Sequence, residues 1–247
     1  MTSLADQLFL LLTDHIEVYS TTDYVRSHRI PLPGLSGHKW NDLTSCHRHR
    51  CLYVSDCNDT CVRRVALDGA ETRWPLSDKP RGLCVKTGDR NLLITCVGAR
   101  KLIELNHAGE VVREMRFQKG IEFPWHSIQS AQSSVQFVVC HGLAAKSLHR
   151  VCLVDTDGQV RRSFGGSCGS DVERLNIPCY MVLDKRTRNV FVADYSSRRV
   201  VELGMESLQF VRTVVERLSS EPRRLHFNHV TRHLYVGSGN CVSVVQL

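Results

Sequence analysis

The chain has 247 residues, of which 42% are hydrophobic and 23% are charged, and its formal net charge is +7. This composition is ordinary for a globular protein and excludes a disordered or fibrous chain. The longest early apolar run, residues 8–12, is too short to span a bilayer, and neither a basic segment nor a cleavage site marks it as a secretory signal. We therefore expect a cytoplasmic protein with no membrane partner.

Six short apolar strands recur along the chain at the spacing of β-propeller blades, which is about 40 to 45 residues. The two clearest copies, residues 52–56 and 190–194, each end in a small residue followed by aspartate. Weaker copies hold the same place in the period at residues 11–14, 93–96, 138–141 and 235–238. Internal repetition at this period predicts a radial all-β fold.

Each copy is followed by a polar turn and a second run in which apolar and polar residues alternate, as half-buried strands do. Asp-Gly pairs at 68–69 and 157–158 then predict tight hairpins to a third, more polar strand. A fourth strand precedes the aspartate-ended one and begins near a proline, which loses no ladder hydrogen bond at that position. These prolines are Pro80, Pro124, Pro178 and Pro222. The predicted fold is a six-bladed β-propeller of four-stranded antiparallel blades.

We expect one propeller domain over residues 1–247. Its blades are predicted at about 1–30, 31–76, 77–117, 118–166, 167–215 and 216–247. In this assignment blade one lacks its innermost strand and the last blade stops after its third. We call the junction between the first and last blades the seam. The pattern leaves two alternatives open there: either residues 1–6 help to close the ring, or a longer protein supplies the missing strands.

Two pairs of strands resemble the NHL repeat, in which a Val-Ala-Asp strand is followed by a polar turn, an arginine and a second strand. They are residues 53–56 with 62–65, and residues 191–194 with 198–201. The resemblance covers nearly the whole chain at blade spacing. It implies a propeller similar to that of tripartite-motif and Brat-like proteins, where the domain is a docking platform for RNA or protein. The upstream modules that carry ubiquitin-ligase activity in that family are absent from this sequence, so only the platform role is implied.

In a four-stranded blade, the turn between the second and third strands shares a face with the start of the innermost strand. We call this the loop face and expect the binding surface there, with basic side chains for acidic groups and aromatic rings for stacking. The candidates are Trp40, Arg81, Arg100, Lys101, Trp125, Lys146, Tyr180, Tyr195, Arg198 and Arg223. A protein partner is favoured because a closed platform suits general docking. Single-stranded RNA is the alternative, and solvated arginines with core aromatics are the competing interpretation.

The 11 cysteines fall mostly within apolar strand-like runs, where a reduced thiol behaves as a small hydrophobic group. Cysteine and histidine are the preferred zinc ligands, so one cluster is a weak alternative metal site. Its members are Cys46, His47, His49 and Cys51. Cys57 and Cys61 follow the intervening strand, whose length of about 17 to 20 Å prevents one ion from joining both turns. A pairing of Cys57 with Cys61 stays open.

Catalysis is not expected. At the aligned positions of the innermost strands only Asp42 and His126 could ligate a metal, whereas a catalytic zinc usually takes three protein ligands. Asp56 and Asp194 have a structural explanation, because an acid at a strand end can accept N–H bonds of the following turn. We expect no cofactor and no small-molecule substrate. A metal-dependent propeller hydrolase or lyase is the alternative.

Overall fold

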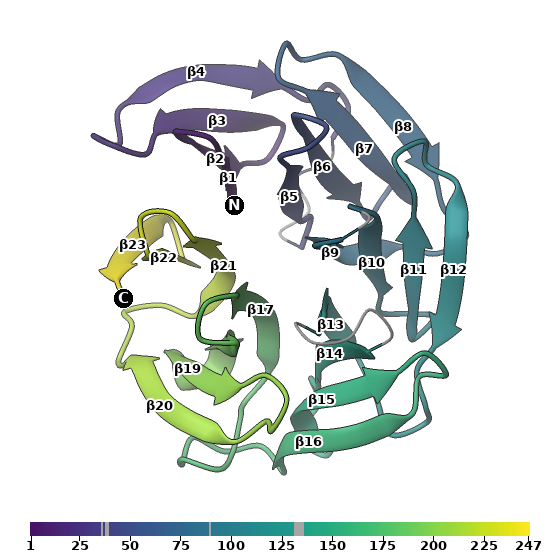
Figure 1. The fold of residues 1–247 in the computed structure, drawn as a ribbon, viewed down its shortest axis with the longest axis vertical. Helices are drawn as coiled ribbons and strands as arrows, with labels where there is room; N and C mark the ends of the chain where they lie inside the picture. The colour runs from purple at the N-terminus through teal and green to yellow at the C-terminus, as the bar shows by residue number, and fades with distance from the viewer. Residues whose placement is uncertain (36, 38–39, 89, 131–135) are drawn as a thin grey trace.

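The computed structural model describes residues 1–35, 37, 40–88, 90–130 and 136–247, and these form a six-bladed β-propeller. Six antiparallel sheets stand around a central axis in chain order, with the innermost strand of each at the axis (Figure 1). The predicted fold class is confirmed. Within the described ranges, no helix is long and apolar enough to cross a membrane.

The blades are consecutive segments of chain. Blade one holds β1 (Thr2–Leu4), β2 (Gln7–Leu11), β3 (His15–Ser20) and β4 (Arg26–Pro31). Blade two holds β5 (Leu43–Cys46), β6 (Cys51–Asp56), β7 (Cys61–Ala66) and β8 (Glu71–Pro75). Blade three holds β9 (Pro80–Val85), β10 (Leu92–Cys96), β11 (Lys101–Leu105) and β12 (Val111–Arg116). Blade four holds β13 (Pro124–Gln129), β14 (Gln136–His141), β15 (His149–Asp155) and β16 (Val160–Gly166). Blade five holds β17 (Pro178–Asp184), β18 (Asn189–Asp194), the single 3-10 turn η1 (Tyr195–Ser197), β19 (Arg199–Gly204) and β20 (Phe210–Val215). Blade six holds β21 (Pro222–Asn228), β22 (His233–Ser238) and β23 (Cys241–Gln246). Four innermost strands begin at the predicted prolines.

The seam differs from the sequence-based expectation at one end. Blade one has its innermost strand, because β1 pairs with β2 and places Thr2 opposite Phe9. The prediction that this strand is missing was wrong, since three residues are too few to show an alternating pattern. Blade six has three strands, as expected. At the seam, Ser3 Oγ of β1 lies 2.6 Å from His226 Nε2 of β21, and Leu8 packs against Tyr235.

The second strands of blades two to five are buried on both faces, because each lies between two neighbouring blades. In blade one, β2 is only half-buried at Gln7, Leu10 and Leu11. β6 and β10 are buried at every position. Phe9 packs with Leu52 between blades one and two, and Leu93 packs with Phe137 between blades three and four. These strands therefore read as continuous apolar runs, whereas the outermost strands β4, β8 and β12 are mostly exposed.

The aspartates of the two clearest repeat copies hold arginines of the following strand. Asp56 Oδ1 accepts the N–H groups of Asn58 and Asp59, both at 3.2 Å, which confirms the expected turn contact. Its Oδ2 accepts Arg63 Nε at 2.9 Å. Asp194 pairs in the same way with Arg199 Nε at 2.8 Å. In each of these blades the aspartate at the end of the second strand therefore forms an ion pair with an arginine of the third strand, seven residues later in one copy and five in the other.

Stability should fall in mild acid because of His141. This side chain is 1% exposed, and burial, together with the charge of Arg150, lowers the pKa of His141 to about 4. An unfolded histidine titrates near pH 6.5, so the unfolded state binds the proton first and the free energy of unfolding decreases as the pH falls from about 6.5 to 4. Between pH 7.5 and 5 the loss from this group is on the order of 2 kcal/mol.

Urea unfolding at the two pH values measures this loss. The variant His141→Gln should lose less stability on acidification than the unsubstituted protein. The exposed His28 supplies the control, and His28→Gln should keep the full loss. An unchanged acid sensitivity in His141→Gln would show that other groups cause it.

Candidate functional site

A buried carboxylate closes the loop-face end of the central channel. Asp42 is 0% exposed. Its Oδ1 accepts the Leu43 N–H at 2.9 Å and the Tyr180 hydroxyl at 3.1 Å. Its Oδ2 accepts the Leu83 N–H at 2.8 Å. Arg224 Nε lies 3.1 Å from Oδ1 and supplies the opposite charge.

These partners come from different blades, so Asp42 links the ring across its axis. Leu83 is in β9, Tyr180 in β17 and Arg224 in β21. Arg224 also donates to the backbone carbonyls of Trp40 and Asn41, at 3.1 and 3.0 Å. The segment that leads into β5 is thereby held across the end of the channel.

We call Asp42 and its partners Leu43, Leu83, Tyr180 and Arg224 the Asp42 plug. Five of the predicted binding residues gather beside it. The rings of Trp40 and Trp125 lie 4.9 Å apart, and Tyr195 lies 6.4 Å from Trp40. The Arg81 guanidinium carbon sits 5.0 Å from the Trp40 ring and 5.1 Å from the Trp125 ring. Arg223 sits 5.7 Å from Trp40 and donates to the Tyr195 hydroxyl at 3.2 Å. We call Trp40, Arg81, Trp125, Tyr195 and Arg223 the loop-face cluster.

A glycine lets two innermost strands approach closely under this cluster. A Cβ at Gly82 would lie 2.6 Å from the carbonyl oxygen of Trp125 and 2.9 Å from the Cα of His126. Any side chain there would push β9 away from β13 and move Arg81 off the Trp125 ring.

The two arginines of the cluster have no acidic partner among the described residues. Neither Arg81 Nη1 nor Arg223 Nε makes a hydrogen bond, although both atoms are shielded from water. Burial lowers the pKa of Arg81, and the nearby Arg224 charge acts in the same direction. The cluster therefore presents positive charge that no described residue neutralises.

The other five predicted residues do not join this cluster. Tyr180 lies beneath it, with its ring stacked on His126 at 4.0 Å. Lys101 is 4% exposed and pairs with Asp78 at 2.6 Å and Glu114 at 3.0 Å. The remaining three are exposed on turns of different blades: Arg100, Lys146 and Arg198.

The candidate zinc residues are dispersed. Cys46 and Cys51 face each other across β5 and β6 and are both buried, whereas His49 stacks on His107 at 5.1 Å. His47 lines a pocket at the opposite end of the channel. No three histidine, cysteine or acidic side chains among the described residues are grouped closely enough to hold a metal ion. All eleven cysteines are free thiols, so Cys57 and Cys61 are not paired.

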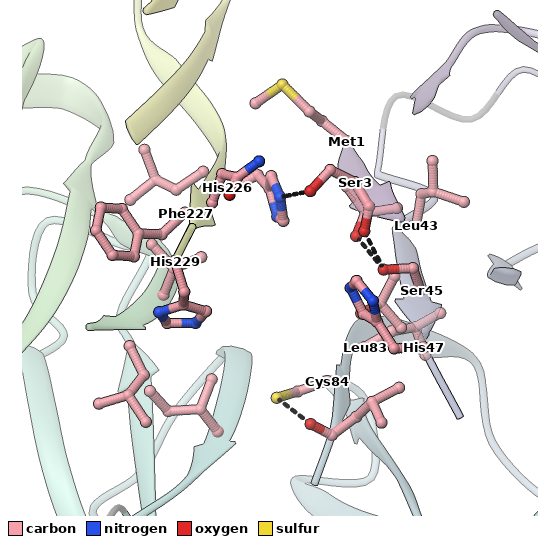
Figure 2. A pocket seen from close by; sticks show the side chains of 18 of the residues that line it. Met1, Ser3, Leu43, Ser45, His47, Leu83, Cys84, His226, Phe227 and His229 are labelled. Carbon is pink, nitrogen blue, oxygen red and sulfur yellow. Dashed lines mark hydrogen bonds between the residues drawn. The ribbon is translucent and has the colours of Figure 1, made fainter. Parts of the chain in front are cut away.

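The other end of the channel is open, and sequence reasoning missed it. A pocket of about 660 Å³, which we call the funnel, is lined by residues of all six innermost strands and of the turns that follow β1, β5, β9, β17 and β21 (Figure 2). Figure 2 places His47 and His229 on facing walls. A signal was present: His47, Lys185 and His229 each stand directly after an innermost strand. A polar residue recurring at that place in the period marks the rim of the channel.

Comparison with known proteins supports the fold but assigns no family and no function. No protein-family model and no curated protein sequence matches the chain. A chain of a nidogen/laminin complex is similar with a TM-score of 0.78 and 16% identity, covering 98% of this chain and 89% of that one. Hydrazine synthase of Kuenenia stuttgartiensis is similar with a TM-score of 0.70 and 13% identity, covering 100% and 94%. A catalytically inactive virginiamycin B lyase of Staphylococcus aureus, solved with quinupristin, gives 0.65 and 11%, covering 92% and 71%. At these identities the likeness shows a six-bladed β-propeller, a fold compatible with an interaction platform.

Proposed function

We propose that this propeller is a non-catalytic interaction module whose loop-face cluster binds an acidic segment of a protein partner. The observation that carries the proposal is the pair of guanidinium groups on Arg81 and Arg223, which flank Trp40 without a carboxylate. Arginine binds carboxylates through two parallel hydrogen bonds, so an aspartate or glutamate of a partner would supply the missing acceptor.

The composition and rigidity of the cluster also favour a protein partner. Tryptophan, tyrosine and arginine are the residues that most often contribute large shares of binding energy at protein interfaces. Here Trp40, Trp125 and Tyr195 pack against one another, and the arginines rest on their rings. Side chains already held in place lose little conformational entropy when a partner binds.

The closed end of the channel supports the same interpretation. Because the Asp42 plug fills the axis, the loop face offers a continuous surface instead of a deep cavity, and such a surface suits a macromolecule better than a small ligand. One structural neighbour belongs to a nidogen/laminin complex. The NHL resemblance of the two aspartate-ended strands is in line with a docking role.

The absence of catalysis is part of the proposal. The two residues that the sequence analysis singled out as possible metal ligands, Asp42 and His126, are both engaged in hydrogen bonds within the propeller. Asp42 has donors on both carboxylate oxygens, and His126 Nε2 lies 3.1 Å from the Leu83 carbonyl oxygen.

Charge reversal at the cluster should abolish partner capture. The double variant Arg81→Glu/Arg223→Glu is compared with the unsubstituted protein in quantitative affinity capture from an extract, followed by calorimetry on each candidate. We expect an acidic partner whose affinity falls by more than about tenfold, because two attractive contacts become repulsive.

The control carries the same change of charge elsewhere. Arg162 and Arg186 are exposed and lie outside the cluster, so Arg162→Glu/Arg186→Glu should bind as the unsubstituted protein does. Thermal unfolding confirms that both double variants are folded. A partner bound equally well by all three proteins would refute the assignment of the loop-face cluster.

Single-stranded RNA is tested in parallel by fluorescence anisotropy with a mixed-sequence oligonucleotide. Binding is expected to be weak, because Lys101 is already paired with acids and the exposed Arg100 and Lys146 stand on separate blades. Tight binding that weakens steeply with salt and depends on Arg81 and Arg223 would replace the protein partner by RNA.

A further inference from the structure

The funnel has the size and wall chemistry of a small-molecule site. Its volume of about 660 Å³ lies within the range of roughly 300 to 1,000 Å³ that is typical of ligand pockets. Several apolar side chains on its walls are only partly buried, and they line the funnel from β9 and β17. These are Cys84, Val85, Val182 and Leu183. Apolar surface left in contact with water inside a concavity favours an apolar occupant.

The floor of the funnel is closed. Tyr180 stacks on His126, and its hydroxyl is bound to Asp42. Both rings also line the funnel. A ligand would therefore enter from the rim and leave its polar end there.

The rim carries positive charge that the described residues do not neutralise. Arg90 and Lys185 line the funnel, and neither is in an ion pair with a described residue. Partial burial lowers the pKa of Lys185, and the charge of Arg90 adds to this effect. Burial also lowers the pKa of His47, with Arg90 and Lys185 acting in the same direction. Because Arg90, Lys185 and His47 act on one another in this way and all line the funnel, they form one region of positive potential.

Two carboxylates lie near this region, and neither cancels it. Asp6 lines the funnel from the first turn of blade one, but it is not among the groups that shift the pKa of Lys185 or His47. Asp184 raises the pKa of His229 but is itself paired with Arg232 at 2.8 Å.

We propose that the funnel binds an amphipathic carboxylic acid, with its apolar body against the walls and its carboxylate at Arg90 and Lys185. This goes beyond the protein-binding function and runs against the sequence-based expectation that no small molecule binds. The funnel and the loop-face cluster lie at opposite ends of the channel, so each proposal can fail without the other.

Isothermal titration with matched probes tests the charge and the apolar body separately. Decanoate carries both features, decan-1-ol has the apolar chain without the charge, and acetate has the carboxylate without the chain. Decanoate should bind about tenfold or more tightly than decan-1-ol, because two cations attract its carboxylate in a partly desolvated site. Acetate should give no measurable heat at the same concentrations.

A charge-removing variant locates the site. Arg90→Gln/Lys185→Gln should weaken decanoate by about tenfold and leave decan-1-ol unchanged. Lys119 and Arg186 are exposed and do not line the funnel. The control Lys119→Gln/Arg186→Gln, with the same loss of charge, should bind decanoate normally.

Crystals soaked with 10-bromodecanoate provide a second measurement that needs no substitution. The bromine should give an anomalous peak deep in the funnel, near Tyr180. Any of four results would overturn the proposal. They are no binding of decanoate, equal affinity for decanoate and decan-1-ol, an unchanged affinity for decanoate in the Arg90→Gln/Lys185→Gln variant, and a bromine peak outside the funnel.

Discussion

The Asp42 carboxylate is the constraint on which the arrangement of the channel depends. A fully buried carboxylate is stable only when its oxygens are paired and hydrogen-bonded. Here the Leu43 and Leu83 amides, the Tyr180 hydroxyl and the Arg224 guanidinium meet that requirement. Because these donors come from blades two, three, five and six, satisfying one charge fixes four blades relative to one another.

Both candidate sites follow from that plug. Above it, Arg224 holds the Trp40 carbonyl, so the Trp40 ring reaches Trp125 and Tyr195 and supports the two arginines. Beneath it, Tyr180 and His126 become the floor of the funnel. One channel is thereby divided into a closed surface that suits a macromolecule and an open cavity that suits a small one. Removing one partner of a buried ion pair costs about 3 to 5 kcal/mol, a large part of the roughly 5 to 15 kcal/mol that stabilises a typical protein.

Local patterns were enough to predict the blades but not the contacts at the axis. Alternation, Asp-Gly turns and strand-initial prolines are short-range signals, and so is the aspartate-to-arginine spacing of Asp56 and Arg63. β1 was not predicted, because its three residues are too few to show an alternation of apolar and polar side chains. Lys101 was misassigned to the binding surface because its neutralising partners, Asp78 and Glu114, lie in the connection between β8 and β9 and in β12. The plug and the funnel were not predicted from the sequence, because their residues, such as Asp42 and Tyr180, come into contact only when the ring closes.

A double-mutant cycle between Asp42 and Arg224, measured by urea unfolding, tests the role of the plug most directly. The cycle uses Asp42→Asn, Arg224→Met and the double variant, each close in shape to the original side chain. If the carboxylate and the guanidinium hold the blades together, the two substitutions should be coupled by about 1 to 3 kcal/mol. Additive effects, with a coupling near zero, would contradict this role and leave the closed loop face without its support.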